Sequence, residues 1–464
     1  MEYDSQGTSS CIPDDRNKIR VFDTLAAVQA ALMIDEVRNV ILYPRYHGDF
    51  DEADAEAFAR ALEVNTSLTT LSLEEVRIAS LSGVHRVANA LASHANFRRL
   101  TLYDNRLGDE GVAVVIQALS RHRYSLAQNM PYSLGNFANA LQAICICGNQ
   151  VGDQGAYWIS QALLHNPTIV ELDLSSNEIR EQGAICLANA LPRSNVSTLI
   201  MNGNGTRAKG AAAFARALQL TYKINVLGLC GNDIGDEGTE LLCEVAKTHP
   251  GLKALLLEDN FIRDRGMFAV AEAHRANRRL GMMEVSWNCI SPRAMHFLSR
   301  GLHNVIYLYL DHCEIGDAHM NILANSIARN KKIKTIFLEG NKVGMLGAKH
   351  LAKALTVNDC LEGIFLDGNR ISNEGAKAFR DVLKTENMTI TRLQLHDAYH
   401  DIQREIDVYL DMNGAGRQKA LRAGFPLTLW PRFLSHRDII SDPDLVYLFL
   451  KERPEVFLSS DRLP

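Results

Sequence analysis

The chain has 464 residues, of which 47% are hydrophobic and 22% are charged, and its formal net charge is −5. Such a mildly acidic chain lacks the basic field that recruits nucleic acid or an anionic membrane, so we expect it to bind neither. Its acidic first residues are not typical of a signal peptide, and its longest apolar runs are far shorter than the ~20 residues that span a bilayer. These features predict a soluble, cytoplasmic protein, with the nucleus as the alternative compartment.

The N-terminal elements come first in chain order. Residues 1–20 are predicted to be disordered. The segment 21–39 is predicted to be a capping helix, because the apolar residues between Val21 and Val37 lie at helical spacing. A short strand, Val40–Leu42, follows this helix and begins a series of similar units.

A repeated pattern of leucine and asparagine continues from this strand. Leu100-x-Leu102-x-x-Asn105 recurs about every 28 residues, for example as Leu227-x-Leu229-x-x-Asn232. Leucines and asparagines at this spacing, in units of roughly 20–29 residues, are typical of leucine-rich repeats. After each asparagine, a turn rich in glycine and acidic residues is followed by apolar residues at helical spacing, which predicts a helix in every repeat.

These patterns together predict an α/β fold. The fold class is a leucine-rich-repeat solenoid, or horseshoe, of about 12 repeats over residues 40–398. Each repeat contributes one strand to a concave parallel β-sheet and one α-helix to the convex side. Because neighbouring repeats bury each other's apolar side chains, such an array grows without splitting into separate cores.

The asparagine of each repeat is predicted to be structural. A buried ladder of these side chains would bond turn backbone groups that otherwise have no partner. Cys313 takes the same position in one repeat, as the pattern permits. The ladder is predicted to comprise Asn105, Asn149, Asn177, Asn204, Asn232, Asn260, Asn288, Asn341 and Asn369.

The repeat length and turns such as Gly235-Asp-Glu-Gly resemble the ribonuclease-inhibitor-like branch of leucine-rich-repeat proteins, over about residues 40–398. That branch includes ribonuclease inhibitor, Ran GTPase-activating protein and the sensor arrays of NOD-like receptors, and the resemblance implies their fold. The chain differs from each of them. It is not rich in cysteine, residues 400–464 mix both signs of charge, and no Gly-x-x-x-x-Gly-Lys-Ser/Thr motif is present. No binding residue is therefore carried over.

Two regions depart from the regular spacing. The step from Leu102 to Ile146 is too long for one repeat, which indicates an insertion at about residues 122–138. Residues 399–464 are predicted to form a helical C-terminal cap and tail, because the end of a solenoid must be covered. The tail, which includes Trp430, is either a lid on the last repeat or a docking motif.

Residues between and just after the strand leucines are expected to face the concave side. In the last third of the array this surface combines aromatic and acidic side chains, a composition found at interface hot spots. The alternative is that the rings only stack along the sheet. The predicted binding residues are Trp287, Tyr307, Tyr309, Phe337, Phe365, Glu258, Glu284, Asp311, Glu339 and Asp367.

The sequence contains no recognised catalytic, phosphate-binding or zinc-binding motif, so we expect no catalytic residue, metal or cofactor. The nine scattered cysteines are predicted to be free thiols. The leading hypothesis is a non-enzymatic scaffold or adaptor that binds a protein presenting Lys or Arg with an apolar anchor. The alternatives are a GTPase activator similar to Ran GTPase-activating protein and a sensor fragment of the NOD-like type. Oligomeric state is left open.

Overall fold

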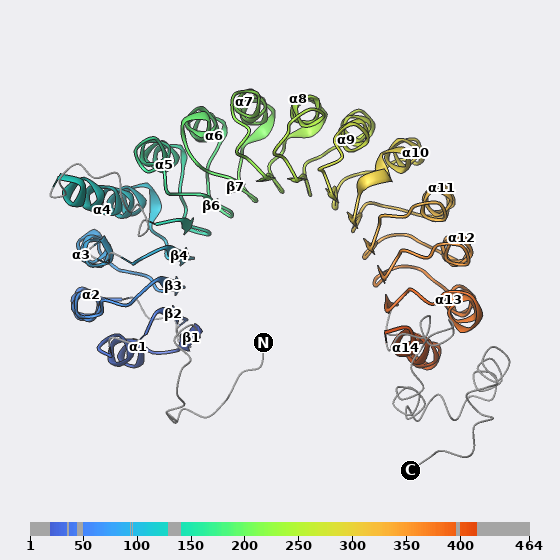
Figure 1. Ribbon diagram of the computed structural model, residues 1–464, viewed down its shortest axis with the longest axis horizontal. Coiled ribbons are helices and arrows are strands. Elements are labelled where there is room, and N and C mark those ends of the chain that lie inside the picture. The colour runs from blue at the N-terminus through green and yellow to red at the C-terminus, as the bar shows by residue number, and fades with distance from the viewer. Residues whose placement is uncertain are drawn as a thin grey trace, which may run out of the picture. The chain divides into compact units, whose positions relative to one another are not determined.

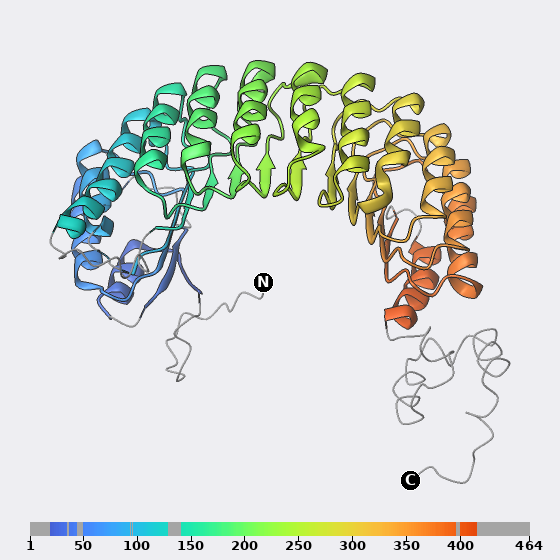
Figure 2. The same cartoon turned by 45° about the horizontal axis from the view of Figure 1, so that its top comes forward.

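Each repeat of the chain folds into a short strand, a turn, a helix and a return segment, as its apolar spacing predicts. A computed structural model describes the chain in these ranges: 19–34, 37–43, 50–92, 94, 96–128, 141–395 and 400–414. The repeats form two compact units, Met1–Thr206 and Arg207–Pro464. Within each unit the strands line one side and the helices the other (Figure 1 and Figure 2).

The first unit alternates strands and helices throughout, with one short 3₁₀ helix, η1, before its last strand. Its elements are β1 (Ile19–Phe22), α1 (Leu25–Leu32), β2 (Asn39–Leu42), α2 (Glu52–Val64), β3 (Thr70–Glu74), α3 (Leu81–Ala92), β4 (Arg99–Tyr103), α4 (Gly108–Gln128), β5 (Ala143–Cys145), α5 (Asp153–His165), β6 (Glu171–Asp173), α6 (Glu181–Ala190), η1 (Leu191–Arg193) and β7 (Thr198–Ile200).

The second unit follows the same order, and its strands are all three residues long. Its elements are α7 (Arg207–Leu220), β8 (Val226–Gly228), α8 (Gly235–Ala246), β9 (Ala254–Leu256), α9 (Asp264–Ala276), β10 (Met282–Glu284), α10 (Pro292–Gly301), η2 (Leu302–Asn304), β11 (Tyr307–Tyr309), α11 (Asp317–Ile327), β12 (Thr335–Phe337), α12 (Met345–Leu355), β13 (Gly363–Phe365), α13 (Asn373–Thr385), β14 (Arg392–Gln394) and α14 (His400–Gly414).

The strands of each unit pair in parallel with their neighbours in the sequence. The register aligns equivalent residues of successive repeats, so that Leu308 pairs with Ile336 and Ile336 with Ile364. All three side chains are fully or almost fully buried. On the helical side, the spaced apolar residues Leu351 and Leu355 are also buried. The core is therefore the layer between strands and helices, and this α/β leucine-rich-repeat solenoid is the fold that the sequence predicts.

The asparagine ladder connects neighbouring repeats inside each unit. The Nδ2 of Asn260 donates to the carbonyls of Leu229 and Glu258, at 2.8 and 2.9 Å. Its Oδ1 accepts the N–H groups of Asn232 and Ile234, at 3.0 and 3.3 Å. One buried side chain thus satisfies four backbone groups in turns where no regular pairing reaches them. Of the nine predicted members, all are buried except Asn369, which is half-buried.

A second ladder, formed by the aspartates of the turns, is a feature that the repeat pattern does not predict. The Oδ1 of Asp153 accepts the N–H groups of Arg180 and Gly183, both at 2.8 Å, at the start of the helix in the next repeat. Asp109, Asp236 and Asp317 make the same pair of contacts. The carboxylate therefore caps the helix of the following repeat, where the unpaired N–H groups favour a negative charge.

A third set of buried asparagines lies five residues before the first residue of a strand. Asn358 donates to the carbonyls of Ile327 and Asn330, at the end of the helix in the previous repeat, and accepts two N–H groups of its own turn. Asn65, Asn277 and Asn387 make comparable contacts. These side chains satisfy carbonyls that a helix end leaves unpaired. They are structural residues that the leucine and asparagine pattern does not identify.

The predicted ends and the insertion differ from the structure in several details. Ile19–Phe22 is a strand, β1, paired with β2, although its first two residues lie in the segment 1–20 that the sequence predicts to be disordered. The capping helix is shorter than 21–39 and spans Leu25–Leu32. The predicted insertion overlaps the end of α4, which extends to Gln128, and its remainder lies outside the described residues. Of the tail, α14 is described, whereas Trp430 lies outside that part.

Among the residues that the structure describes, no helix is both long enough and apolar enough to cross a membrane.

Candidate functional site

Three aromatic side chains form a stack on the strand-lined side of the second unit. The sheet register places Tyr309 beside Phe337 and Phe337 beside Phe365. The ring centroids of these pairs are 4.3 and 4.8 Å apart, and the ring planes are nearly parallel, at 2° and 6°. This spacing is that of adjacent strands, because equivalent residues of a parallel sheet project in the same direction. We refer to these three residues as the aromatic column.

The aromatic column is less exposed than the sequence suggested. All three side chains are half-buried, because each ring covers the face of its neighbour. The stacking alternative therefore describes contacts that the structure shows, and the rings are neither fully exposed nor part of the buried core. Their edges and the outer faces of the stack are what a partner could reach.

Trp287 forms a separate ring pair beside the aromatic column. It lies in the turn after β10, where its backbone is left-handed with φ of 56°, and 53% of its side chain is exposed. Its indole stacks on His312, with centroids 3.9 Å apart and planes 19° apart. Tyr307, at the start of β11, is 42% exposed. The sequence identified the tryptophan but not its histidine partner, which occupies the equivalent turn one repeat later.

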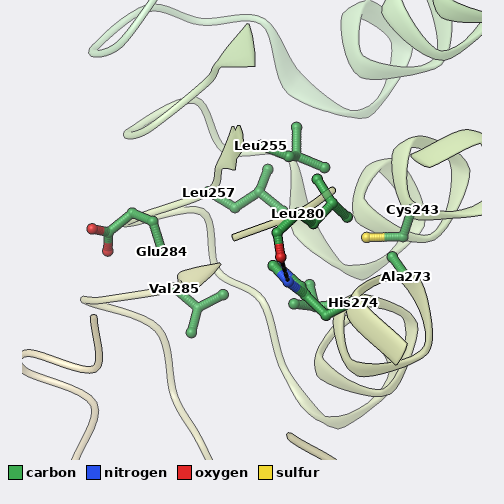
Figure 3. A pocket seen from close by; sticks show the side chains of 9 residues that line it. Cys243, Leu255, Leu257, Ala273, His274, Leu280, Glu284 and Val285 are labelled. Carbon is green, nitrogen blue, oxygen red and sulfur yellow. Dashed lines mark hydrogen bonds between the residues drawn. The ribbon is translucent and has the colours of Figure 1, made fainter. Parts of the chain in front are cut away.

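Glu284, on β10, is the most strongly perturbed carboxylate on this surface. Burial raises its pKa to about 7, and the charges of Glu258 and Asp311 add to the effect. A hydrogen bond from the N–H of Ser286, at 3.0 Å to Oε1, opposes the rise. Figure 3 shows the carboxylate pointing away from the apolar side chains behind the strand, among them Leu255. The carboxyl group of Glu284 therefore titrates near neutral pH.

Asp311 and Glu258 follow their strands on the same surface. Burial raises the pKa of Asp311 to about 6, although its Oδ1 accepts the N–H of Glu339 at 2.6 Å. Burial also raises the pKa of Glu258, and the charge of Asp259 adds to it. Glu339 and Asp367, which follow β12 and β13, are half-buried. The ten predicted residues thus lie on neighbouring strands and turns of one unit.

The raised pKa values bear on the repulsion between these acidic residues. Like charges on adjacent strands repel and destabilise a sheet. Protonation of Glu284 and Asp311 relieves part of that repulsion in the free protein. The acidic residues are therefore compatible with a stable sheet, and a cationic partner would favour their charged forms.

Behind β10, a small internal pocket contains His274 (Figure 3). Its Nδ1 is 3.3 Å from the carbonyl oxygen of Leu280, and burial lowers the pKa of the imidazole to about 4. The side chain is therefore neutral at physiological pH. We assign it a structural role, because apolar residues such as Leu257 and Val285 line the rest of the pocket.

We expect Glu284 to make the protein more stable as the pH falls from about 8 to about 5.5, by about 2 kcal/mol. The pKa of Glu284 is about 7 in the folded protein, against ~4.3 in an unfolded chain. Between these values the folded state binds more protons, so the free energy of unfolding rises as the pH falls. Urea unfolding at both pH values should show a gain in Glu284→Gln that is smaller than in the wild type by about 2 kcal/mol, because Asp311, whose pKa burial also raises, keeps its own contribution in both proteins.

The wild type must be compared with Glu284→Gln, because His274 changes the free energy of unfolding with pH in the opposite direction. Its pKa is lowered on folding, so stability is lost as the pH drops below its ordinary value. Tyr309→Phe is the matched control, since it keeps the neighbouring ring and removes a hydroxyl whose pKa is raised above 10. The assignment of Glu284 would be refuted if Glu284→Gln kept the pH dependence of the wild type.

Comparisons with known proteins agree with the repeat geometry. A family model described as Leucine Rich repeat matches residues 165–188. The human NACHT, LRR and PYD domains-containing protein 13 is 30% identical over 191 residues, which is 41% of this chain and 17% of that protein. Ribonuclease inhibitor of Sus scrofa is 24% identical over 59% of this chain and 71% of its own length. The chain thus aligns with only a small part of the first relative.

A solved structure shows a more distant likeness. A chain in the crystal structure of the Rad7 and Elc1 complex in yeast aligns with 80% of this chain and 88% of its own length, with a TM-score of 0.46 and 14% sequence identity. The described residues fold as a leucine-rich-repeat solenoid, and part of the chain is similar in sequence to ribonuclease inhibitors.

Proposed function

We propose that the chain is a non-enzymatic scaffold that binds a protein partner through the aromatic and acidic surface of its second unit. The observation that supports this most directly is the aromatic column, bordered by the exposed Trp287 and by carboxylates. Large rings held in place by stacking lose little conformational entropy on binding, which makes them effective anchors. One relative is named ribonuclease inhibitor, and its name says that it inhibits another protein, a ribonuclease.

The chemistry of the surface favours a partner that presents arginine or lysine next to an apolar side chain. A guanidinium group stacks on an aromatic face and donates to carboxylates at the same time. Trp287 offers such a face. It follows β10, and Asp311 follows β11, the strand that pairs with β10. An apolar side chain would pack against the edges of the aromatic column. The partner would therefore carry a basic and apolar patch.

Peptide selection tests this proposal directly, because it does not require the natural partner. A random peptide library is displayed and selected on the full-length protein, and the recovered sequences are compared with the unselected pool. We expect enrichment of arginine or lysine within a few residues of an aromatic or aliphatic residue. Recovered peptides without this combination, or peptides that bind equally well when Trp287 is replaced by alanine, would contradict the proposal.

The acidic residues at the edge of this surface should act mainly on the association rate. We expect Glu339→Lys and Asp367→Lys to slow binding of a selected basic peptide and to weaken the dependence of the rate on salt. Surface charges of this kind steer the encounter, whereas dissociation depends on the buried contacts. Stopped-flow measurements at two ionic strengths give both quantities. Asn202→Lys, at the equivalent position of the first unit, is the matched control and should leave the rate unchanged.

A further inference from the structure

Two cysteines and an aspartate meet on the strand-lined side of the first unit. Cys145 ends β5, Cys147 follows two residues later, and Asp173 ends β6. The two sulfur atoms are 3.1 Å apart. Each residue offers one ligand atom, and these three atoms all lie within 4.8 Å of one another. This surface lies outside the proposed protein-binding site, and the inference does not rest on the proposed function.

The sheet itself brings the three side chains together. Residues two apart on an extended chain project to the same side, which places Cys147 next to Cys145. The parallel register pairs Cys145 with Asp173 on the neighbouring strand. Ile144, before Cys145, and Ile146, between the two cysteines, are buried in the core. The backbone at this position is therefore held by the packing of both strands.

The carboxylate is oriented by a neighbour on its own strand. The hydroxyl of Ser175 donates to Oδ1 of Asp173 at 2.6 Å, and the N–H of Ser175 donates to the same oxygen at 3.0 Å. Groups that ligate metals are commonly held by hydrogen bonds of this kind. A carboxylate oxygen of Asp173 lies within 4.8 Å of both sulfur atoms. Cys145 and Asp173 are half-buried, so solvent reaches the cluster.

We propose that Cys145, Cys147 and Asp173 bind a divalent cation of the zinc class. Two thiolates and one carboxylate suit such a borderline-soft ion, which takes sulfur, nitrogen and oxygen ligands in tetrahedral geometry. Three protein ligands leave a fourth position for water, as in sites from which the metal exchanges. With metal–sulfur bonds of ~2.3 Å, the sulfur atoms would move slightly apart, to roughly 3.8 Å. A small rotation of the half-buried Cys145 provides this movement.

A disulfide is the competing fate of the same two thiols. It requires Cα atoms no more than ~7 Å apart, and residues two apart on an extended strand lie near that limit at about 6.6 Å. This separation permits the bond. A disulfide would make no use of the Asp173 carboxylate, which lies within 4.8 Å of both sulfur atoms, so the three-residue cluster favours metal binding over oxidation.

Cobalt titration tests the proposal, because Co²⁺ replaces Zn²⁺ and its bonds to thiolates absorb light. The reduced full-length protein is freed of metal with a chelator and titrated with Co²⁺, followed by competition with Zn²⁺. We expect one equivalent to bind with thiolate-to-cobalt charge-transfer absorption that Zn²⁺ abolishes. Cys145→Ser should lose this absorption, and Asp173→Asn should weaken affinity about 10–100-fold. Circular dichroism checks that each variant is folded, which matters most for the buried Cys147.

Cys230→Ser is the matched control. Cys230 is a buried cysteine at the position in its repeat that corresponds to Cys147, and its replacement should leave cobalt binding unchanged. The proposal is overturned if the wild type shows no charge-transfer absorption or if Cys145→Ser retains it. It is also overturned if the reduced protein does not bind cobalt but air oxidation joins Cys145 to Cys147, as peptide mass mapping would reveal.

Discussion

Replacing Asn260 with alanine should lower the free energy of unfolding by about 3 kcal/mol or more, although the substitution removes only a small side chain. The amide makes four hydrogen bonds to buried backbone groups of its own repeat and the preceding one. Leaving a buried donor or acceptor without a partner costs ~1–3 kcal/mol per group. Water that enters the gap recovers part of this loss, so the sum is smaller than four separate penalties. Urea unfolding followed by circular dichroism measures the change.

Hydrogen exchange makes this prediction specific to the ladder. In Asn260→Ala the amides of Asn232 and Ile234 lose their acceptor, so they should exchange faster than the amides of other repeats. Asn321→Ala is the control: this asparagine is exposed on α11, where alanine is a better helix former, and stability should change by less than ~0.5 kcal/mol. Equal effects of the two substitutions would show that the buried hydrogen bonds contribute little to stability.

Replacing Phe337 with alanine should weaken binding of a selected basic and apolar peptide about 30-fold or more. Phe337 is the central ring of the aromatic column and contacts both Tyr309 and Phe365. Truncation of a hot-spot residue costs ~2 kcal/mol or more, which corresponds to this change in Kd. Because the ring is half-buried in a stack, stability should also fall, by about 1–3 kcal/mol. Calorimetry measures the first effect and urea unfolding the second.

Ile200→Ala separates binding from packing. Ile200 is half-buried at the equivalent strand position in the first unit, so its truncation should cost stability without affecting the peptide. Affinity retained in Phe337→Ala, and likewise in Tyr309→Ala and Phe365→Ala, would move the binding site elsewhere on the chain. Complete loss of folding in Phe337→Ala would mean that the aromatic column belongs to the core.

Much of the fold could be predicted from residues that recur at a fixed spacing. Leu227 of β8 and Ile336 of β12 identify strands, because every repeat buries its apolar side chains against the next repeat. The same reasoning predicted the burial of Asn232 and Asn260. It was weaker at the N-terminus, where β1 and the short α1 do not share the repeat pattern. There the element boundaries depend on contacts with β2 rather than on periodicity.

The spacing of leucines and asparagines is enough to predict the repeat, the side of each strand that faces solvent, and hence the residues of the aromatic and acidic surface. How those side chains interact follows only from the packing of one repeat against the next. The stacking of Phe337 and the raised pKa of Glu284 depend on neighbours about 28 residues away in the chain, which shield them from water. The meeting of Cys145 with Asp173 depends on the register of two strands. A linear pattern cannot show such contacts, because proximity and burial arise when separate repeats pack together.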